Sequence, residues 1–254
     1  MKCRYSGGMF LLLLVSCLLA FAAPAFANRT MGRTAIPAQG LTLHTVKINL
    51  PASTHVACQL GETRPPAWIN SGYLFPPDDR YYTYLKYSDC PACGPGGLLI
   101  TAAHLILYYQ EACSIPVEVS IVPAIQSGGC AVPDVNNTLC GPVPFQLTVS
   151  NPGGYDFIMA LAQPCCITGD AFLLIRFVDF GTCTTLPDLV AADVPCNPCV
   201  SYNLNPSFGF VDMCADPFWA QYNSGNPNMF VDADCCTTTP TLHGNWGRLK
   251  QLYR

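Results

Sequence analysis

The chain is divided by proline, glycine and other turn residues into many short apolar segments. In these segments apolar residues alternate with polar ones or form brief runs, as they do in strands with one or both faces buried. Turn sequences such as Asn-Pro-Gly-Gly at 151–154 mark the connections. The pattern predicts strands at 41–50, 80–87, 98–109, 117–122, 145–150, 156–162 and 172–180, with weaker candidates at 199–204 and 228–232.

No segment has the pattern of a long amphipathic helix. Only at 98–112, where nearly every position is apolar, does periodicity fail to choose between helix and strand, and the flanking glycines favour a strand. We therefore predict an all-β fold: a disulfide-stapled β-sandwich or jelly-roll of roughly seven to nine strands with little helix. A closed double barrel is the alternative.

The N-terminus has the features of a secretory signal peptide. Lys2 and Arg4 precede an apolar run at 9–22, and Ala-Phe-Ala at 25–27 supplies the small residues of a cleavage site. We expect residues 1–27 to be removed. Cys17 also fits a lipid-modified cysteine, but further apolar sequence follows it where a polar tether is expected.

The remainder is predicted to be a single secreted β-sandwich domain, 28–240, followed by a C-terminal tail, 241–254. No later apolar run reaches the roughly 18 residues that cross a bilayer, so we expect no transmembrane segment. The ending Trp-Gly-Arg-Leu-Lys-Gln-Leu-Tyr-Arg resembles a short tail found on exported proteins of uncultivated environmental bacteria. That resemblance implies a bacterial extracellular or cell-surface protein; a terminal segment docked on the sandwich is the alternative.

Cysteine usage agrees with export. An even number of cysteines in an oxidising compartment predicts seven disulfides, whose pairing the sequence does not give. A bond within the neighbouring pairs 165–166 or 235–236 would close a strained ring, so each of these cysteines should bond elsewhere. The cysteines beyond the signal peptide are Cys58, Cys90, Cys93, Cys113, Cys130, Cys140, Cys165, Cys166, Cys183, Cys196, Cys199, Cys214, Cys235 and Cys236.

Two Cys-x-x-Cys spacings, at 90–93 and 196–199, are also typical of zinc or redox sites. They lie farther apart than in a zinc ribbon, and neither opens a helix in a βαβ setting. Disulfides remain the favoured interpretation.

The charge balance excludes nucleic acid as a partner. Without Lys2 and Arg4 the chain has 10 basic and 16 acidic residues, a net charge of −6, and it contains no basic run. Only 11% of residues are charged, and the lysines beyond the signal peptide are Lys47, Lys86 and Lys250. Soluble monomers usually carry about a quarter charged residues, with lysines on strand edges. We also expect tyrosines at water-facing strand positions, and we therefore predict that the chain binds other copies of itself; these tyrosines are Tyr81, Tyr82, Tyr108 and Tyr109.

The segment Leu-Ile-Thr-Ala-Ala-His at 99–104 resembles the histidine motif of chymotrypsin-like serine proteases, and Gly-Tyr-Asp-Phe-Ile-Met-Ala-Leu at 154–161 resembles their aspartate segment. The resemblance implies His104 as general base, Asp156 as its orienting partner and Ser224 as nucleophile.

The chain departs from that family at several points. Tyr222 and Asn223 stand where the glycine-rich oxyanion stretch belongs, and only 30 residues follow Ser224. The apolar segment also continues past His104, whereas the motif should end in a turn. Strand alternation places His104 on one face with Leu98, Ile100, Ala102, Ile106 and Tyr108, so we interpret it as a half-buried histidine of a sheet and expect no enzymatic activity.

Other candidate sites are fewer. Aspartates near the C-terminus could bind calcium as a cofactor, although turn and capping roles are the alternative: Asp212, Asp216, Asp232 and Asp234. Exposed aromatic residues could stack on sugar rings, although strand aromatics are more often buried: Tyr81, Tyr82, Tyr84, Tyr87, Tyr108, Tyr109, Trp219 and Trp246. The sequence therefore favours a secreted structural or adhesive protein, such as a fibre or surface-layer subunit, with a carbohydrate- or ligand-binding module as the alternative.

Overall fold

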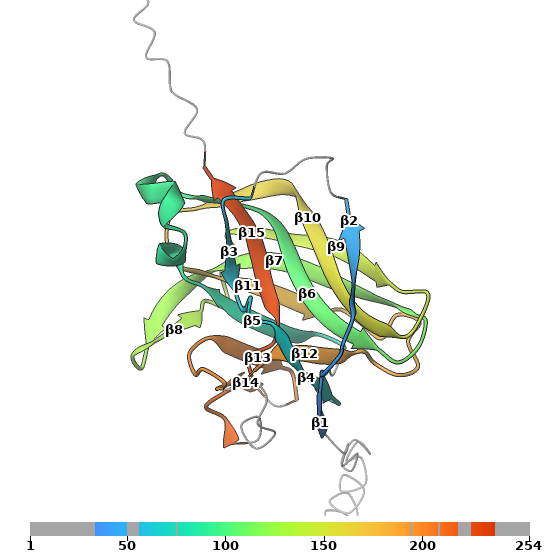
Figure 1. Ribbon diagram of the computed structural model, residues 1–254. Coiled ribbons are helices and arrows are strands. Elements are labelled where there is room, and N and C mark those ends of the chain that lie inside the picture. The colour runs from blue at the N-terminus through green and yellow to red at the C-terminus, as the bar shows by residue number, and fades with distance from the viewer. Residues whose placement is uncertain are drawn as a thin grey trace, which may run out of the picture. The chain divides into compact units, whose positions relative to one another are not determined.

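Two β-sheets pack face to face around a shared apolar core (Figure 1). The structure is a computed structural model that describes residues 34–49, 56–74, 76–193, 195–207, 209–217 and 225–236. The predicted all-β, disulfide-stapled sandwich is confirmed. The predicted signal peptide (1–27) and tail (241–254) lie outside the described residues.

The first sheet, sheet A, has eight strands. Six run in the order β1-β4-β12-β6-β10-β2, while β15 pairs with β6 and β3. All pairings are antiparallel except that of β10 with β2. The bounds are β1 Thr34–Pro37, β2 Leu43–Ile48, β3 Cys58–Gly61, β4 Pro66–Ser71, β6 Leu98–Tyr109, β10 Gly153–Ile167, β12 Asp188–Ala192 and β15 Met229–Cys235.

The second sheet, sheet B, has seven antiparallel strands in the order β14-β13-β5-β11-β7-β8, with β9 also pairing with β7. Two short 3₁₀ helices, η1 Tyr87–Asp89 and η2 Pro91–Gly96, lie between β5 and β6. The strand bounds are β5 Asp79–Leu85, β7 Ser114–Ser127, β8 Cys130–Pro133, β9 Cys140–Thr148, β11 Ala171–Phe177, β13 Ser201–Asn205 and β14 Gly209–Asp212.

Each of the nine segments predicted as strands overlaps an observed strand, and the undecided segment 98–112 contains the long strand β6. The predicted number of strands, seven to nine, is too low, because the described residues alone contain fifteen. The additional strands are β1, β3, β4, β8, β12 and β14, all of four to six residues, too short for an alternating pattern to show.

The main core lies between the sheets. Leu105 and Phe157 from sheet A, and Leu173 and Ile175 from sheet B, are fully buried in one cluster. Their sequence neighbours on each strand point to the opposite face because side chains alternate along a strand. The face of sheet A turned away from sheet B is called its outer face below.

All fourteen cysteines between Cys58 and Cys236 are paired, which contradicts the zinc alternative at both Cys-x-x-Cys spacings. The two cysteines of each Cys-x-x-Cys spacing belong to different disulfides. Cys90, for example, bonds Cys58, whereas Cys93 bonds Cys235. The seven disulfides are Cys58–Cys90, Cys93–Cys235, Cys113–Cys183, Cys130–Cys199, Cys140–Cys165, Cys166–Cys236 and Cys196–Cys214.

Neither vicinal pair bonds to itself, as predicted, and the two pairs are joined to each other through Cys166–Cys236. Cys165 bonds Cys140 of β9 and so links the two sheets. Gly97 makes room for this junction: a Cβ there would lie 3.0 Å from Cys236 Sγ and 3.1 Å from Cys166 Sγ, and its φ of +104° disfavours other residues.

Within the described ranges, no helix is long and apolar enough to cross a membrane.

Complete pairing of the cysteines should be visible in the mass of the oxidised chain. Each disulfide removes two hydrogens, so the oxidised chain should weigh about 14 Da less than the reduced chain. Intact-mass spectrometry before and after reduction measures the difference, and alkylation without reduction is the control. Two or more alkylated thiols in freshly secreted, unreduced protein would contradict complete pairing.

Candidate functional site

Four polar side chains form a row across adjacent strands on the outer face of sheet A. They are Asp156 of β10, His104 of β6, Asp232 of β15 and Gln59 of β3. The pairing of β10 with β6, β6 with β15 and β15 with β3 brings these residues together from distant parts of the chain. We refer to them as the polar row.

The alternation of each strand sets the direction of these side chains. Phe157, Leu105 and Val231, each next to a member of the row, are fully buried in the core between the sheets. The row residues therefore point to the opposite face. An apolar cluster made by Ile106, Val190 and Phe230 lies on that same face.

His104 is held between two carboxylates. Its Nδ1 lies 3.1 Å from Asp156 Oδ1, and its Nε2 lies 3.2 Å from Asp232 Oδ2. Gln59 Nε2 donates a 2.9 Å hydrogen bond to the other oxygen of Asp232. The Phe230 ring stacks on the imidazole with centroids 4.2 Å apart, and His104 is only 4% exposed.

The two carboxylates favour a charged imidazole. Burial disfavours the imidazolium, but the hydrogen bonds and charges of Asp156 and Asp232 outweigh burial and raise the pKa of His104 to about 9. Burial also disfavours the Asp232 carboxylate, yet His104 and Gln59 together lower the pKa of Asp232. At neutral pH the row therefore holds an imidazolium between two carboxylates.

The prediction of a histidine on a sheet face is correct, but His104 is buried rather than half-buried, and the residues predicted to share its face are partly wrong. Leu98 and Ile100 belong to the core between the sheets, together with Leu105. The reason is a register irregularity between β6 and β15. Asp232 pairs with Ala102, and the next residue, Ala233, pairs with Ile100, so that Thr101 is skipped in the pairing. Such a bulge reverses the alternation between the two halves of β6.

The structure brings together His104 and Asp156, as the resemblance to chymotrypsin-like proteases implies. Ser224 lies outside the described residues. In a catalytic triad the second imidazole nitrogen takes the proton of the nucleophile. Here that nitrogen, Nε2, lies against Asp232. The N–H of Gly225, the residue after Ser224, donates to the Ala192 carbonyl at 3.2 Å.

The aspartates proposed for calcium do not assemble. Asp212 lies on β14 of sheet B, whereas Asp232 lies on β15 of sheet A. Asp212 accepts hydrogen bonds from the N–H groups of Cys199 and Cys214, and Asp234 from that of Cys235, which are turn and capping roles. Asp216 lies in the turn after β14, where its N–H donates to the Asp212 carbonyl. In the described part of the chain, no three histidine, cysteine or acidic side chains are placed to hold a metal ion.

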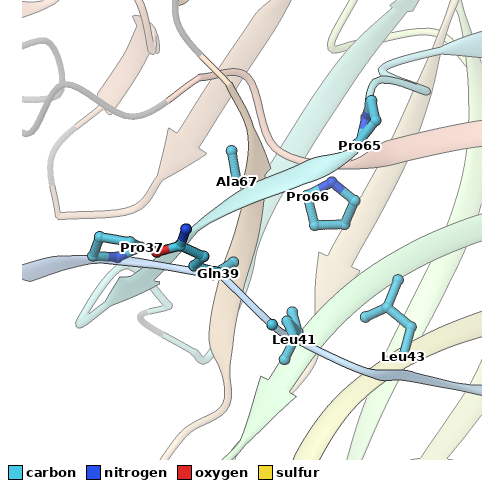
Figure 2. A pocket seen from close by; sticks show the side chains of 9 residues that line it. Pro37, Gln39, Leu41, Leu43, Pro65, Pro66 and Ala67 are labelled. Atoms are coloured by element: carbon cyan, nitrogen blue, oxygen red, sulfur yellow. The ribbon is translucent and has the colours of Figure 1, made fainter.

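A groove of about 500 Å³ lies between the segment that joins β1 to β2 and the start of β4 (Figure 2). Its lining carries no charged side chain. It consists of Pro37, Ala38, Gln39, Gly40, Leu41, Leu43, Pro65, Pro66 and Ala67.

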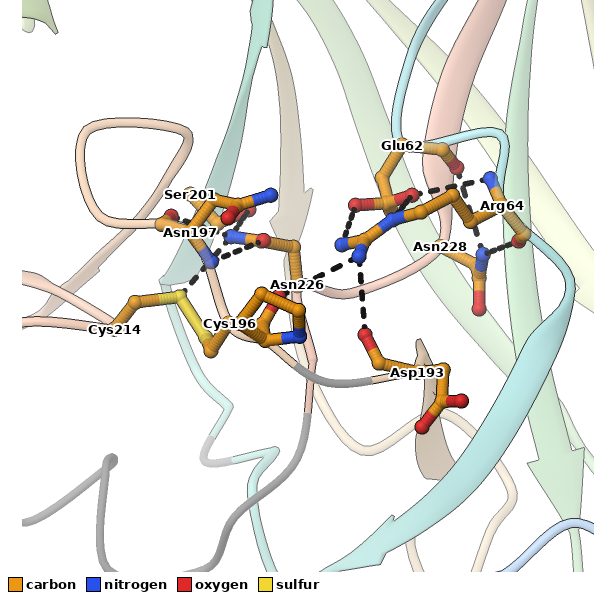
Figure 3. Close-up of polar contacts among 10 residues, drawn as sticks. Glu62, Arg64, Asp193, Cys196, Asn197, Ser201, Cys214, Asn226 and Asn228 are labelled. Carbon is orange, nitrogen blue, oxygen red and sulfur yellow. Dashed lines mark hydrogen bonds and ion pairs between the residues drawn. A yellow bond between two sulfur atoms is a disulfide. The ribbon is translucent and has the colours of Figure 1, made fainter.

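A second polar cluster fixes the segment that precedes β15 (Figure 3). Buried Glu62 forms a two-point ion pair with Arg64, whose Nη1 also donates to the Asp193 carbonyl at 3.1 Å. Asn228 Nδ2 donates to the Arg64 carbonyl at 2.7 Å, and Asn226 donates to Ser201 Oγ at 3.0 Å. These bonds are made within the chain, so we interpret the cluster as structural.

The expectation that the tyrosines face water is wrong for Tyr81, Tyr82 and Tyr109, each at most 1% exposed. Tyr81 and Tyr109 lie in the core between the sheets. Tyr82 lies on the other face of sheet B, where Ala131 and Val132 of β8 pack against its cluster. Tyr84, Tyr87 and Tyr108 are partly buried, and Trp219 and Trp246 lie outside the described residues.

The exposed aromatic residues of the described ranges are instead phenylalanines. Phe180 is 49% exposed and Phe210 is 42% exposed. The Phe210 ring stacks on Tyr202 with centroids 5.2 Å apart. The sequence does not reveal either residue, because the predicted strand 172–180 includes Phe180, which lies beyond the end of β11, and the short strand β14 that carries Phe210 has no readable pattern.

No family model and no curated protein matches the chain. Among solved structures, the chain is similar to the crystal structure of the cysteine protease and lectin-like domains of Cwp84, a surface layer associated protein of Clostridium difficile, with a TM-score of 0.44 and 12% identity. The match covers 66% of this chain and 33% of that chain, so the chain spans about a third of the length of the solved one. A likeness this weak carries no argument about function.

The polar row should make stability depend on pH. Because folding raises the pKa of His104 from an ordinary 6.5 to about 9, its contribution is complete below pH 6.5 and is lost as pH rises through 9. That shift corresponds to at most about 3 kcal/mol. The difference in unfolding free energy between wild type and His104→Gln should therefore shrink by that order between pH 6.5 and 9.5 in denaturant titrations.

The matched control is His44→Gln, which removes an exposed imidazole from β2. It should follow the wild-type pH profile. A difference in unfolding free energy between His104→Gln and wild type that stayed constant from pH 6.5 to 9.5 would show that His104 is not charged in the polar row. The pH dependence has the opposite direction for Asp232. Because folding lowers the pKa of Asp232, its contribution to stability is lost as pH falls through that lowered value.

Proposed function

We propose that the chain is an extracellular structural or adhesive module that associates with other copies of itself. The observation that carries this proposal is the pair of apolar side chains exposed on edge strands. Ile36 of β1 is 51% exposed, and Phe210 of β14 is 42% exposed. Among the described strands, β1 pairs only with β4, and β14 only with β13.

Open strand edges usually carry features that prevent pairing with another sheet, lysine above all. Neither β1 nor β14 contains a lysine. Exposed apolar residues beside unpaired backbone groups favour contact with a further β-surface. In a protein secreted in quantity, the partner available at highest concentration is a second copy, through a closed dimer or an open head-to-tail assembly.

The disulfides support an extracellular location, because such bonds persist in oxidising compartments. They join elements across the whole span from Cys58 to Cys236. A body tied in this way keeps its shape outside the cell, as a structural or adhesive module requires.

We also propose that the chain is not an enzyme. The contact of His104 Nε2 with Asp232 supports this proposal, because a general base needs that nitrogen free to reach a nucleophile.

A ligand-binding module is the second candidate, and the uncharged groove of about 500 Å³ favours it. Its proline, leucine and alanine lining suits an apolar ligand. The stacked Phe210 and Tyr202 are the better candidates for contact with a sugar ring. A glycan array with purified protein tests this alternative.

Self-association should depend on the exposed edge residues. Burying one large apolar side chain is worth about 1.5–3 kcal/mol, so Ile36→Lys combined with Phe210→Lys should raise the dissociation constant at least about tenfold. Sedimentation equilibrium of the oxidised protein at micromolar concentration measures the change.

The control is Phe180→Lys, which alters a side chain of similar exposure (49%) in the segment after β11 rather than on an edge strand. It should leave the association unchanged. A wild-type chain that stays at monomer mass at every concentration would refute self-association and favour the ligand-binding module.

Purified protein should not hydrolyse peptide or ester substrates. His104→Gln should lower stability and change no hydrolytic rate, because His104 is held by two carboxylates in the polar row. Fluorophosphonate labelling followed by mass spectrometry provides the check. Stoichiometric modification of Ser224 would show that the chain is a serine hydrolase after all.

A further inference from the structure

Residues 34–48, here called the N-terminal strap, consist of two strands joined by a turn at 39–40 and cross the outer face of sheet A (Figure 1). Its first part, β1, pairs with β4, and its last part, β2, pairs with β10. These two partners lie on opposite sides of β12 and β6 in the sheet order. The strap therefore spans the sheet from one side to the other.

Apolar contacts fix the middle and end of the strap. Leu41 and Leu43 pack against the cluster of Ile106, Val190 and Phe230 on the outer face. Val46 and Ile48, further along β2, pack at the margin of the core between the sheets. Without the strap these apolar surfaces and the edge of β10 would be open.

The fit between strap and sheet is close at Gly154 of β10. A Cβ at this position would lie 2.8 Å from Leu41 Cδ1 and 3.0 Å from Leu43 Cδ2. Any larger side chain there competes directly with the two leucines for space. Gly154 thus permits the two leucines to lie against the sheet.

The strap differs from the rest of the described fold in how it is held. No cysteine lies between residues 28 and 57, whereas seven disulfides join the elements from Cys58 to Cys236. In the described residues the strap is held on the sheet by backbone pairing, by apolar contacts and by the ring contact of His44 with Tyr155. It can therefore leave without breaking a covalent bond or disturbing the stapled body.

We propose that the strap is exchangeable between copies: the outer face of sheet A accepts the strap of a second copy in place of its own. The exchange conserves every strap contact, because the second copy offers the same strap sequence to the same surface. It adds a strand to a sheet edge through backbone hydrogen bonds, with the two leucines giving specificity. This inference rests on the proposed self-association. It specifies that the segment exchanged is the strap, whose first strand, β1, exposes Ile36.

The test uses two variants of the mature chain whose straps and sheets do not fit within one molecule. Gly154→Val fills the space that Leu41 and Leu43 need, so its own strap is displaced. Leu41→Ala with Leu43→Ala gives a strap too small for the wild-type surface. When the two are mixed, each strap fits the sheet of the other variant better than its own.

A one-to-one mixture should form a heterodimer in at least tenfold excess over either homodimer in native mass spectrometry. The triple variant, with all three substitutions in one chain, should restore the fit within a molecule and form no such complex with either parent. Intact mass and circular dichroism verify that each chain is folded, and Gly154→Ala replaces Gly154→Val if the latter does not fold.

A mixture that remains as two monomeric species would overturn strap exchange, as would equal amounts of heterodimer and homodimers. Sedimentation of the wild-type chain decides self-association separately. If the wild type associates while the mixed variants stay apart, the copies join by another surface, and only the exchange is wrong.

Discussion

The Cys166–Cys236 disulfide joins the ends of β10 and β15, and the arrangement of both sheets depends on this junction. The neighbour of Cys166 bonds to β9 of the opposite sheet, and the neighbour of Cys236 bonds to η2. Three disulfides in succession thus connect β9, β10, β15 and η2 at one end of the sandwich. A native disulfide typically stabilises by about 2–4 kcal/mol through its effect on the unfolded chain. Linked together, these three also restrict how the two sheets move relative to each other.

The polar row supplies a second constraint, on strand register. In an antiparallel sheet a shift of one residue turns every side chain to the opposite face. A one-residue shift of β6 would direct the charged imidazole of His104 into the core and separate it from Asp156 and Asp232. Burying an unpaired charge costs several kcal/mol. The row therefore favours one alignment of three strands whose apolar residues alone would tolerate others.

Much of the fold could be predicted from the sequence, because β5, β7 and β11 are long enough to show their apolar pattern. Strands such as β1 and β14 were missed because four residues contain no readable period. The contacts of His104 in the candidate site are harder to predict. The sequence connects His104 with Asp156 only through the resemblance to proteases, and it suggests Asp232 as a calcium ligand. Its place beside His104 depends on the pairing of β6 with β15, and the register of two strands so far apart in the chain leaves no signal in a single sequence.

The parallel pairing of β2 with β10 has a consequence for the order in which the chain acquires its structure. Leu43 lies opposite Gly154, so the strap pairs with a strand more than a hundred residues later in the chain. Contacts of such long separation form late in folding, because the ordering of the intervening chain must come first. Because a chain is synthesised from its N-terminus, the leucines of the strap are thus exposed before their own sheet exists. In that interval a finished neighbouring molecule and the unfinished sheet of the same chain compete for the same short segment.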